Sequence, residues 1–246
     1  DREYAMGRRS SEYLLEHPTW PTEWILQALI IAWNDYLYTG DKRSIEANYD
    51  ILKARTLQSL RRDNGLISTT DDRVQSDEFK SSIRFYGNMR DIVDWPRCGD
   101  WPHGEDDHYH LTDYNTVVNA FHYRALEILQ QMALLTNRTA EAEALQKECQ
   151  TLREAFNELL FDAENGVYRD GVDSDHVTLH SNLFPLALGL VDKVYEDDVM
   201  DYIRSRGLVC SVYAAQFLMD AVYGAGDGDY GLHLLTKEDE RSWYNM

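Results

Sequence analysis

Hydrophobic positions along the chain alternate between two kinds of predicted helix. Residues 22–38 and 114–136 are apolar on nearly every face, which is typical of helices buried on all sides. Residues 42–62 and 139–161 hold their apolar positions on one stripe, as expected of a helix with one face in water. Further helical patterns cover residues 2–16, 177–190, 197–206, 211–223 and 230–236. Only residues 66–90 suggest short strands or turns, so the chain is predicted to be all-α.

This alternation favours one helical architecture over others. Inner helices of a ring of helical hairpins are dry on both sides, whereas outer helices are dry on one side. A four-helix bundle would instead show a similar stripe on every helix, and no fixed residue-level repeat indicates a solenoid. We therefore expect residues 1–246 to form a single domain, an (α/α)6 toroid. The count of roughly eight or nine helices is short of six hairpins, so we expect the barrel to be incomplete.

A polar stretch from Asp91 to Asn115 interrupts the helices. It holds two Asp-Trp-Pro triplets and three histidines, and Trp95 and Trp101 are each held extended by the proline that follows. Loops on a rigid scaffold commonly carry binding groups. Aromatic faces beside carboxylates suit a sugar, which has apolar C–H faces and many hydroxyls. A surface loop pinned by two tryptophans explains the composition equally well.

Three stretches stand at comparable starts of predicted inner helices: residues 20–24, 94–115 and 178–182. Each contains aromatic, carboxylate, histidine or asparagine side chains. We expect these stretches to line one mouth of the ring, with Trp24 and Trp95 facing a shared pocket.

Charge and composition exclude several classes of partner. Lys+Arg 24 against Asp+Glu 43 gives a net charge of −19, which argues against nucleic acid or an anionic membrane. No apolar run approaches the roughly 20 residues that span a bilayer. The three cysteines have no CxxC spacing and form no disulfide framework.

Acid–base chemistry on a glycoside needs two carboxylates. Asp94 and Asp100 are candidates by type, as are the three consecutive acids Glu105, Asp106 and Asp107. For the consecutive acids, a solvated acidic loop is favoured over a catalytic pair. His180 fits either a ligand contact or a hydrogen-bonded core histidine.

No metal or cofactor is predicted. His103, His108 and His110 lie near acids, but their spacing matches no zinc signature. The glycine-rich residues 224–231 follow a predicted helix instead of a strand, which indicates a loop and not a nucleotide site.

Several strings resemble the catalytic domain of glycoside hydrolase family 78, the α-L-rhamnosidases. They occur in family order over nearly the whole length, and their succession carries the likeness more than any single one. The strings are DREYAMGR at 1–8, HPTWPTEW at 17–24, AWNDYLYTGD at 32–41, IVDWP at 92–96, NTVVNAFHYRALEIL at 115–129, NGVYRDG at 165–171, LHSNLFPLALGLV at 179–191 and RSWYNM at 241–246.

The resemblance implies an (α/α)6 barrel and inverting hydrolysis of terminal α-L-rhamnosyl groups. Family motifs for the general acid and base find no match: Arg2-Glu3 lacks the flanking aspartates, and the base motif would follow Met246. The chain is therefore expected to be a catalytic-domain fragment, inactive alone. By residue matching, the substrate-binding candidates are Trp24, Asp94, Trp95, Glu23, Asn115 and His180.

The expected partners are a carbohydrate substrate (a rhamnoside) and either the rest of the parent chain or a second copy, covering exposed barrel edges. Neither nucleic acid nor membrane is expected. A periplasmic or secreted location would need a signal upstream of Asp1. Two alternatives remain: another (α/α)6 glycosidase of different sugar specificity, and a non-catalytic carbohydrate-binding module.

Overall fold

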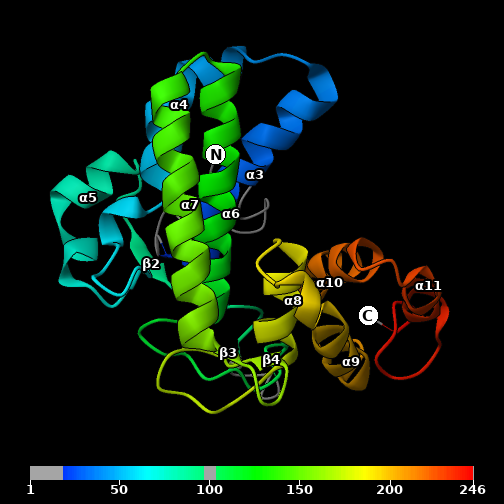
Figure 1. Cartoon of the computed structure of the whole chain (residues 1–246). Helices are drawn as coiled ribbons and strands as arrows, with labels where there is room; N and C mark the ends of the chain where they lie inside the picture. Colours follow the sequence, from blue (N-terminus) through cyan, green and yellow to red (C-terminus); the bar gives the residue numbers. More distant parts are fainter. Residues whose placement is uncertain (1–18, 97–103, 246) are drawn as a thin grey trace. The chain divides into compact units, whose positions relative to one another are not determined.

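The structure is a computed structural model that describes residues 19–96 and 104–245. The predicted helix at 2–16 lies outside the described residues, as do Asp100, Trp101 and His103. The described part is mainly helical (Figure 1), which confirms the predicted all-α class. None of its helices is both long and apolar enough to cross a membrane.

The chain groups into two compact units, and each is described by itself. The first comprises residues 1–91 and 121–155, and the second residues 92–120 and 156–246.

The first unit begins at β1 (Thr19–Pro21), which pairs in parallel with β2 (Asn88–Arg90). The ring of Trp20 on β1 is buried and stacks on Phe85 at a centroid distance of 4.8 Å. Between the strands lie α3 (Thr22–Thr39), α4 (Arg43–Arg55), η2 (Gln58–Leu60), η3 (Asp72–Gln75) and α5 (Asp77–Ser82). Helix α5 was not predicted, because its six residues are too few to show a helical period.

Helix α3 differs from its prediction. Ile25, Leu26 and Leu29 are buried, but Leu37 is 61% and Tyr38 92% exposed. The prediction of burial on every face is therefore right for the first turns and wrong for the last. An apolar sequence shows that a helix can be buried on all sides, not that a neighbour lies on each side.

Helix α4 confirms its predicted stripe but ends earlier than predicted. It stops at Arg55, and Leu57 then takes a left-handed backbone conformation with φ 63°. The buried side chains of the stripe are Ile45, Tyr49, Leu52, Leu57 and Leu60. The last two reach the core through η2 and not through a continued helix.

Helices α6 (Thr116–Leu135) and α7 (Thr139–Leu160) form an antiparallel hairpin (Figure 1). Helix α6 is buried along most of its length and α7 on one face only, as predicted. Asn137 adopts φ 61° in the turn that joins them. Both helices continue from one unit into the other.

The second unit contains the start of α6, the end of α7 and a small hairpin of β3 (Phe161–Asp162) and β4 (Val167–Tyr168). Asn165-Gly166 makes its turn, as predicted. The remaining elements are α8 (Leu179–Ala187), η4 (Lys193–Tyr195), α9 (Glu196–Arg206), α10 (Val212–Gly224) and α11 (Gly228–Thr236). Helix α8 packs against both α9 and α10, so it forms the centre of this unit.

Candidate functional site

The centre of the candidate site is the carboxylate of Asp94, which is only 1% exposed. It accepts hydrogen bonds from His180 Nε2 at 2.8 Å, from the backbone N–H of Ser211 at 2.9 Å and from the Ser211 hydroxyl. The backbone N–H of Trp95 adds a fourth bond at 2.7 Å. Asp94 therefore ties its loop to the first turns of α8 and α10.

The backbone that presents Asp94 is strained. Val93 has φ 64°, and the N–H of Asp94 donates to the carbonyl of Ile92 at 2.7 Å. This three-residue turn is the rare γ-turn with a positive central φ. A β-branched residue in that region is a genuine outlier, and such strain persists only where surrounding contacts over-determine it. The four bonds to the Asp94 side chain and the burial of Val93 supply those contacts.

His180 lies in the first turn of α8 and is fully buried. Because a carboxylate oxygen accepts, Nε2 is the nitrogen that donates to Asp94. The other ring nitrogen, Nδ1, has no hydrogen-bond partner in the part of the chain that the structure describes. The helix start itself is fixed by a capping box, in which Thr178 and Ser181 bond each other's backbone N–H groups.

Asp107 is a second buried acid at the start of α8. Its carboxylate accepts from the backbone N–H of Leu179 at 2.8 Å and pairs with the guanidinium of Arg206. That carboxylate raises the pKa of Arg206. Glu105 likewise pairs with Arg241. The prediction of a solvated acidic loop is therefore wrong for both acids, because cations far along the chain neutralise them.

Asp170 is the third buried acid beside this helix start. It accepts from Thr178 Oγ1 at 2.8 Å, from His176 Nδ1 at 2.7 Å and from the backbone N–H of His110 at 2.8 Å. The rings of His110 and His176 stack at 3.9 Å. Across residues 19–96 and 104–245, no group of three or more His, Cys, Asp or Glu side chains could hold a metal ion.

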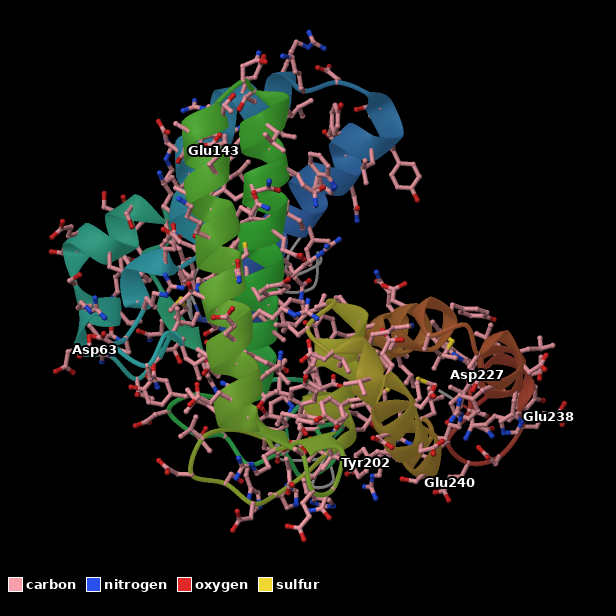
Figure 2. The ribbon with its side chains drawn as sticks, viewed as in Figure 1. Asp63, Glu143, Tyr202, Asp227, Glu238 and Glu240 are labelled. Atoms are coloured by element: carbon pink, nitrogen blue, oxygen red, sulfur yellow. The ribbon has the colours of Figure 1, made fainter. Side chains whose placement is uncertain are left out.

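Two tyrosines complete the polar surroundings of α8. The hydroxyl of Tyr109 donates to the Asp170 carbonyl, and burial raises the pKa of Tyr109 well above its usual value. Tyr202 on α9, labelled in Figure 2, donates to the carbonyl of Val177 at 2.9 Å. Burial raises the pKa of Tyr202 to about 12, so both hydroxyls remain donors at neutral pH.

The structure brings only some of the predicted site residues together. Asp94 and His180 are hydrogen-bonded, and Trp95 follows Asp94 with its side chain 45% exposed. Asn115 belongs to the same unit but is buried, and its Oδ1 accepts from the N–H of Val118 at the start of α6.

Glu23 and Trp24 belong to the first unit, in the first turn of α3. Glu23 is buried and Trp24 half-buried. A carboxylate in a helix's first turn opposes the helix dipole, which gives Glu23 a structural role.

The sequence did not single out Ser211, Asp107 or Asp170 as parts of this network. Ser211 was detectable in part, because a serine before an apolar helical run is a common N-cap, and it does cap α10 through the N–H of Tyr213. Asp107 gave no local signal, since its partner Arg206 lies 99 residues away. Asp170 bonds His176 and Thr178 within a loop, where no periodic pattern marks the contact.

In chemical terms, the three buried carboxylates are acceptors already saturated by protein donors. They act as supports that fix the start of α8 and the loop bearing Trp95. The accessible element is the Trp95 ring, a rigid aromatic face suited to stacking on the C–H face of a sugar ring.

Comparison with known proteins gives the family. Residues 12–246 match the bacterial α-L-rhamnosidase six-hairpin glycosidase domain. The chain belongs to this family of glycoside hydrolases, as its resemblance to family 78 predicted.

Individual relatives agree. The chain is 23% identical over 223 residues to an α-L-rhamnosidase from Alteromonas sp. (strain LOR), covering 90% of this chain and 22% of that protein. The α-L-rhamnosidase of Dictyoglumus thermophilum matches with TM-score 0.65 and 18% identity, over 89% of this chain and 22% of that one. A family 78 rhamnosidase of Bacillus sp. GL1 matches with TM-score 0.66 and 19% identity, over 87% and 21%. These structural likenesses confirm the predicted fold class, and the chain spans about a fifth of the length of each relative.

Proposed function

We propose that the chain forms part of an inverting glycoside hydrolase that releases terminal α-L-rhamnose from glycosides or polysaccharides. The observation that carries this proposal is the family match over residues 12–246. The relatives described above are rhamnosidases, and the chain spans only part of their length. We therefore propose the activity for the whole enzyme and not for these 246 residues alone.

The general acid and general base of this enzyme lie outside the 246 residues. An inverting enzyme places its two carboxyl groups about 6.5–9.5 Å apart, with room for water between the base and the sugar. Asp94, Asp107 and Asp170 do not suit that role, because each accepts at least two hydrogen bonds from protein donors and none is more than 7% exposed. Because protein donors already bond these three carboxylates, we assign them a structural role.

Within this proposal, the chain supplies part of the sugar-binding surface. In the second unit, Trp95 is the proposed aromatic wall, and Asp94, Asn115 and His180 are the other proposed substrate-binding residues. In the first unit, Trp24 and Glu23 are the proposed ones. The bonds around Asp94 support this assignment for Trp95, because they fix the backbone from which its ring projects. Either the rest of the parent chain or a second copy is the proposed cover for the open barrel edges.

The test compares aryl α-L-rhamnoside hydrolysis by two purified proteins. One is the 246-residue chain, and the other is the product of the entire open reading frame that encodes it. We expect release at the buffer rate from the chain and turnover from the longer product, with the β-anomer of L-rhamnose formed first in the NMR spectrum.

Two outcomes would overturn the proposal. Turnover by the 246-residue chain alone would place the acid and base within it. Hydrolysis of an aryl α-glucoside or α-fucoside in preference to the rhamnoside would assign the domain a different sugar.

A further inference from the structure

A second candidate site lies in the first unit, in a cavity of about 560 Å³ between α3 and α4. Its volume falls within the range of roughly 300–1,000 Å³ typical of small-molecule sites. Apolar side chains of both helices line it, including Ile31 and Ile51, together with the polar side chains of Asp35 and Asn48. Two arginines, Arg55 and Arg84, complete the lining.

Arg84 occupies a backbone position that normally selects against arginine. It follows α5 and has φ 50°. Its N–H donates to the Ser81 carbonyl, and the N–H of Phe85 donates to the Lys80 carbonyl. This pair of bonds is the Schellman motif that ends helices, where glycine or asparagine is preferred because φ is positive.

The same motif ends three other helices among the described residues. The residue at the corresponding position is Gly189 after α8, Gly226 after α10 and Asn137 after α6. Arg84 is the exception among these four, and a strained residue held in place by its surroundings indicates a functional constraint. What distinguishes Arg84 is that it lines the cavity.

Arg55 is aimed by its own hydrogen bond. Its Nε donates to the carbonyl of Ile83 at 3.1 Å, next to Arg84 in the chain. Both guanidinium groups line the same cavity, and burial, followed by the charge of Arg84, lowers the pKa of Arg55.

Within residues 19–96 and 104–245, neither guanidinium has a carboxylate partner. Among the described residues, the ion pairs of this acidic chain involve other cations, although it contains Asp+Glu 43 against Lys+Arg 24. Two neighbouring cations without a counter-ion repel each other, and an anion between them would remove that repulsion. Arginine suits carboxylates because its planar group forms two parallel hydrogen bonds to them.

We propose that the cavity between α3 and α4 binds an acidic sugar of the hexuronate class, with Arg55 and Arg84 holding its carboxylate. The remaining lining fits the rest of such a ligand. Asp35 and Asn48 can bond ring hydroxyls, and Ile31 and Ile51 can contact the C–H face of the ring. This assignment is independent of the rhamnosidase proposal, because it concerns binding by the first unit and involves no reaction.

The experiment is a calorimetric titration of the 246-residue chain with D-galacturonate, its neutral methyl ester, D-galactose and inorganic phosphate. We expect galacturonate to bind at millimolar concentration or below, and the ester and galactose at least about tenfold more weakly. Phosphate lacks the ring and is expected to bind more weakly than galacturonate.

Three variants test the residues. Arg84→Gly is expected to weaken galacturonate binding at least about tenfold while leaving the thermal midpoint unchanged or higher, because glycine suits the positive φ. Arg55→Gln is expected to weaken binding similarly. Arg43→Gln is the matched control on α4, since Arg43 pairs with Asp41 outside the cavity, and it should bind as the parent does.

Several results would overturn the inference. Unchanged galacturonate affinity in both Arg84→Gly and Arg55→Gln would remove the arginines from the site. Equal binding of the methyl ester would show that the carboxylate is not recognised. Phosphate binding as tight as that of galacturonate would make this a general anion site and not a sugar site.

Discussion

The carboxylate of Asp94 accepts a hydrogen bond from Nε2 of His180 at 2.8 Å, and both side chains are almost fully buried. The two residues are 86 positions apart in the chain. Their contact attaches the loop that contains Trp95 to the first turn of α8. The stability of this unit and the position of the Trp95 ring therefore both depend on the Asp94 carboxylate.

Substitution of Asp94→Asn is expected to destabilise the protein by about 2–4 kcal/mol. The amide nitrogen would face the donors of His180 and Ser211, leaving buried groups unsatisfied. Urea denaturation followed by circular dichroism measures this change. Asp63→Asn is the matched control, because Asp63 is exposed (labelled in Figure 2), and a loss within about 0.5 kcal/mol is expected. Equal stability of the two variants would contradict a structural role for Asp94.

At position 93, glycine is expected to give a more stable protein than alanine, the reverse of the usual order. Both Val93→Ala and Val93→Gly lose the buried side chain, but only glycine relieves the positive φ. We expect Val93→Gly to be more stable than Val93→Ala by about 1 kcal/mol. Thermal denaturation of both variants measures the difference.

Val117 in α6 provides the control pair for Val93. It is fully buried in regular helix, where glycine should be less stable than alanine by about 1 kcal/mol. If alanine were also preferred at position 93, the strained turn would be refuted.

His122 is expected to make the first unit less stable in mild acid. Its Nδ1 contacts the Thr56 carbonyl at 2.6 Å, and burial lowers its pKa from 6.5 to about 4. Between these pH values the unfolded state binds a proton that the folded state does not. Stability therefore falls as the pH falls from 6.5 to about 4, by up to about 3 kcal/mol, and this contribution changes no further below that.

The measurement is the free energy of unfolding at several pH values for the parent and for His122→Asn. Asparagine can keep the bond to Thr56 but does not titrate. We expect the difference in unfolding free energy between the two proteins to shrink as the pH falls through this window. A difference that does not vary with pH would show that His122 is not responsible.

Trp95→Ala is expected to weaken binding of L-rhamnose about two- to tenfold, because a stacked aromatic face contributes roughly 0.5–1.5 kcal/mol. Its exposure also means that the fold should tolerate the change. Titration by NMR measures the affinity, with Tyr38→Ala as the control for loss of an exposed aromatic side chain. Retained affinity in Trp95→Ala would exclude this ring from the sugar site.

Local sequence patterns predicted the features that depend on neighbouring residues alone, such as a helix face and a tight turn. The stripe on α4, from Ile45 to Leu60, was predictable because burial of one helix face imposes a period of 3.6 residues. The Asn165-Gly166 turn was predictable because it needs a residue that tolerates positive φ, which Gly166 adopts at 69°.

The candidate site was only partly predictable. The resemblance brought Asp94 and His180 to attention, but the burial of Asp107 depends on Arg206, 99 residues away, and no local pattern encodes that pairing. The exposed last turns of α3 have the same explanation, since hydrophobicity does not specify whether a neighbour is present. Arg84 was missed because α5 itself was not predicted.

The three acids around the start of α8 also have a consequence for biosynthesis. The ribosome delivers Asp94 well before Ser211, which is 117 residues further along the chain. At a translation rate of about 5–20 residues per second, the loop waits on the order of ten seconds for its partners. During that interval the side chains of Asp94 and Asp107 lack their partners on α8 and α10 and stay hydrated.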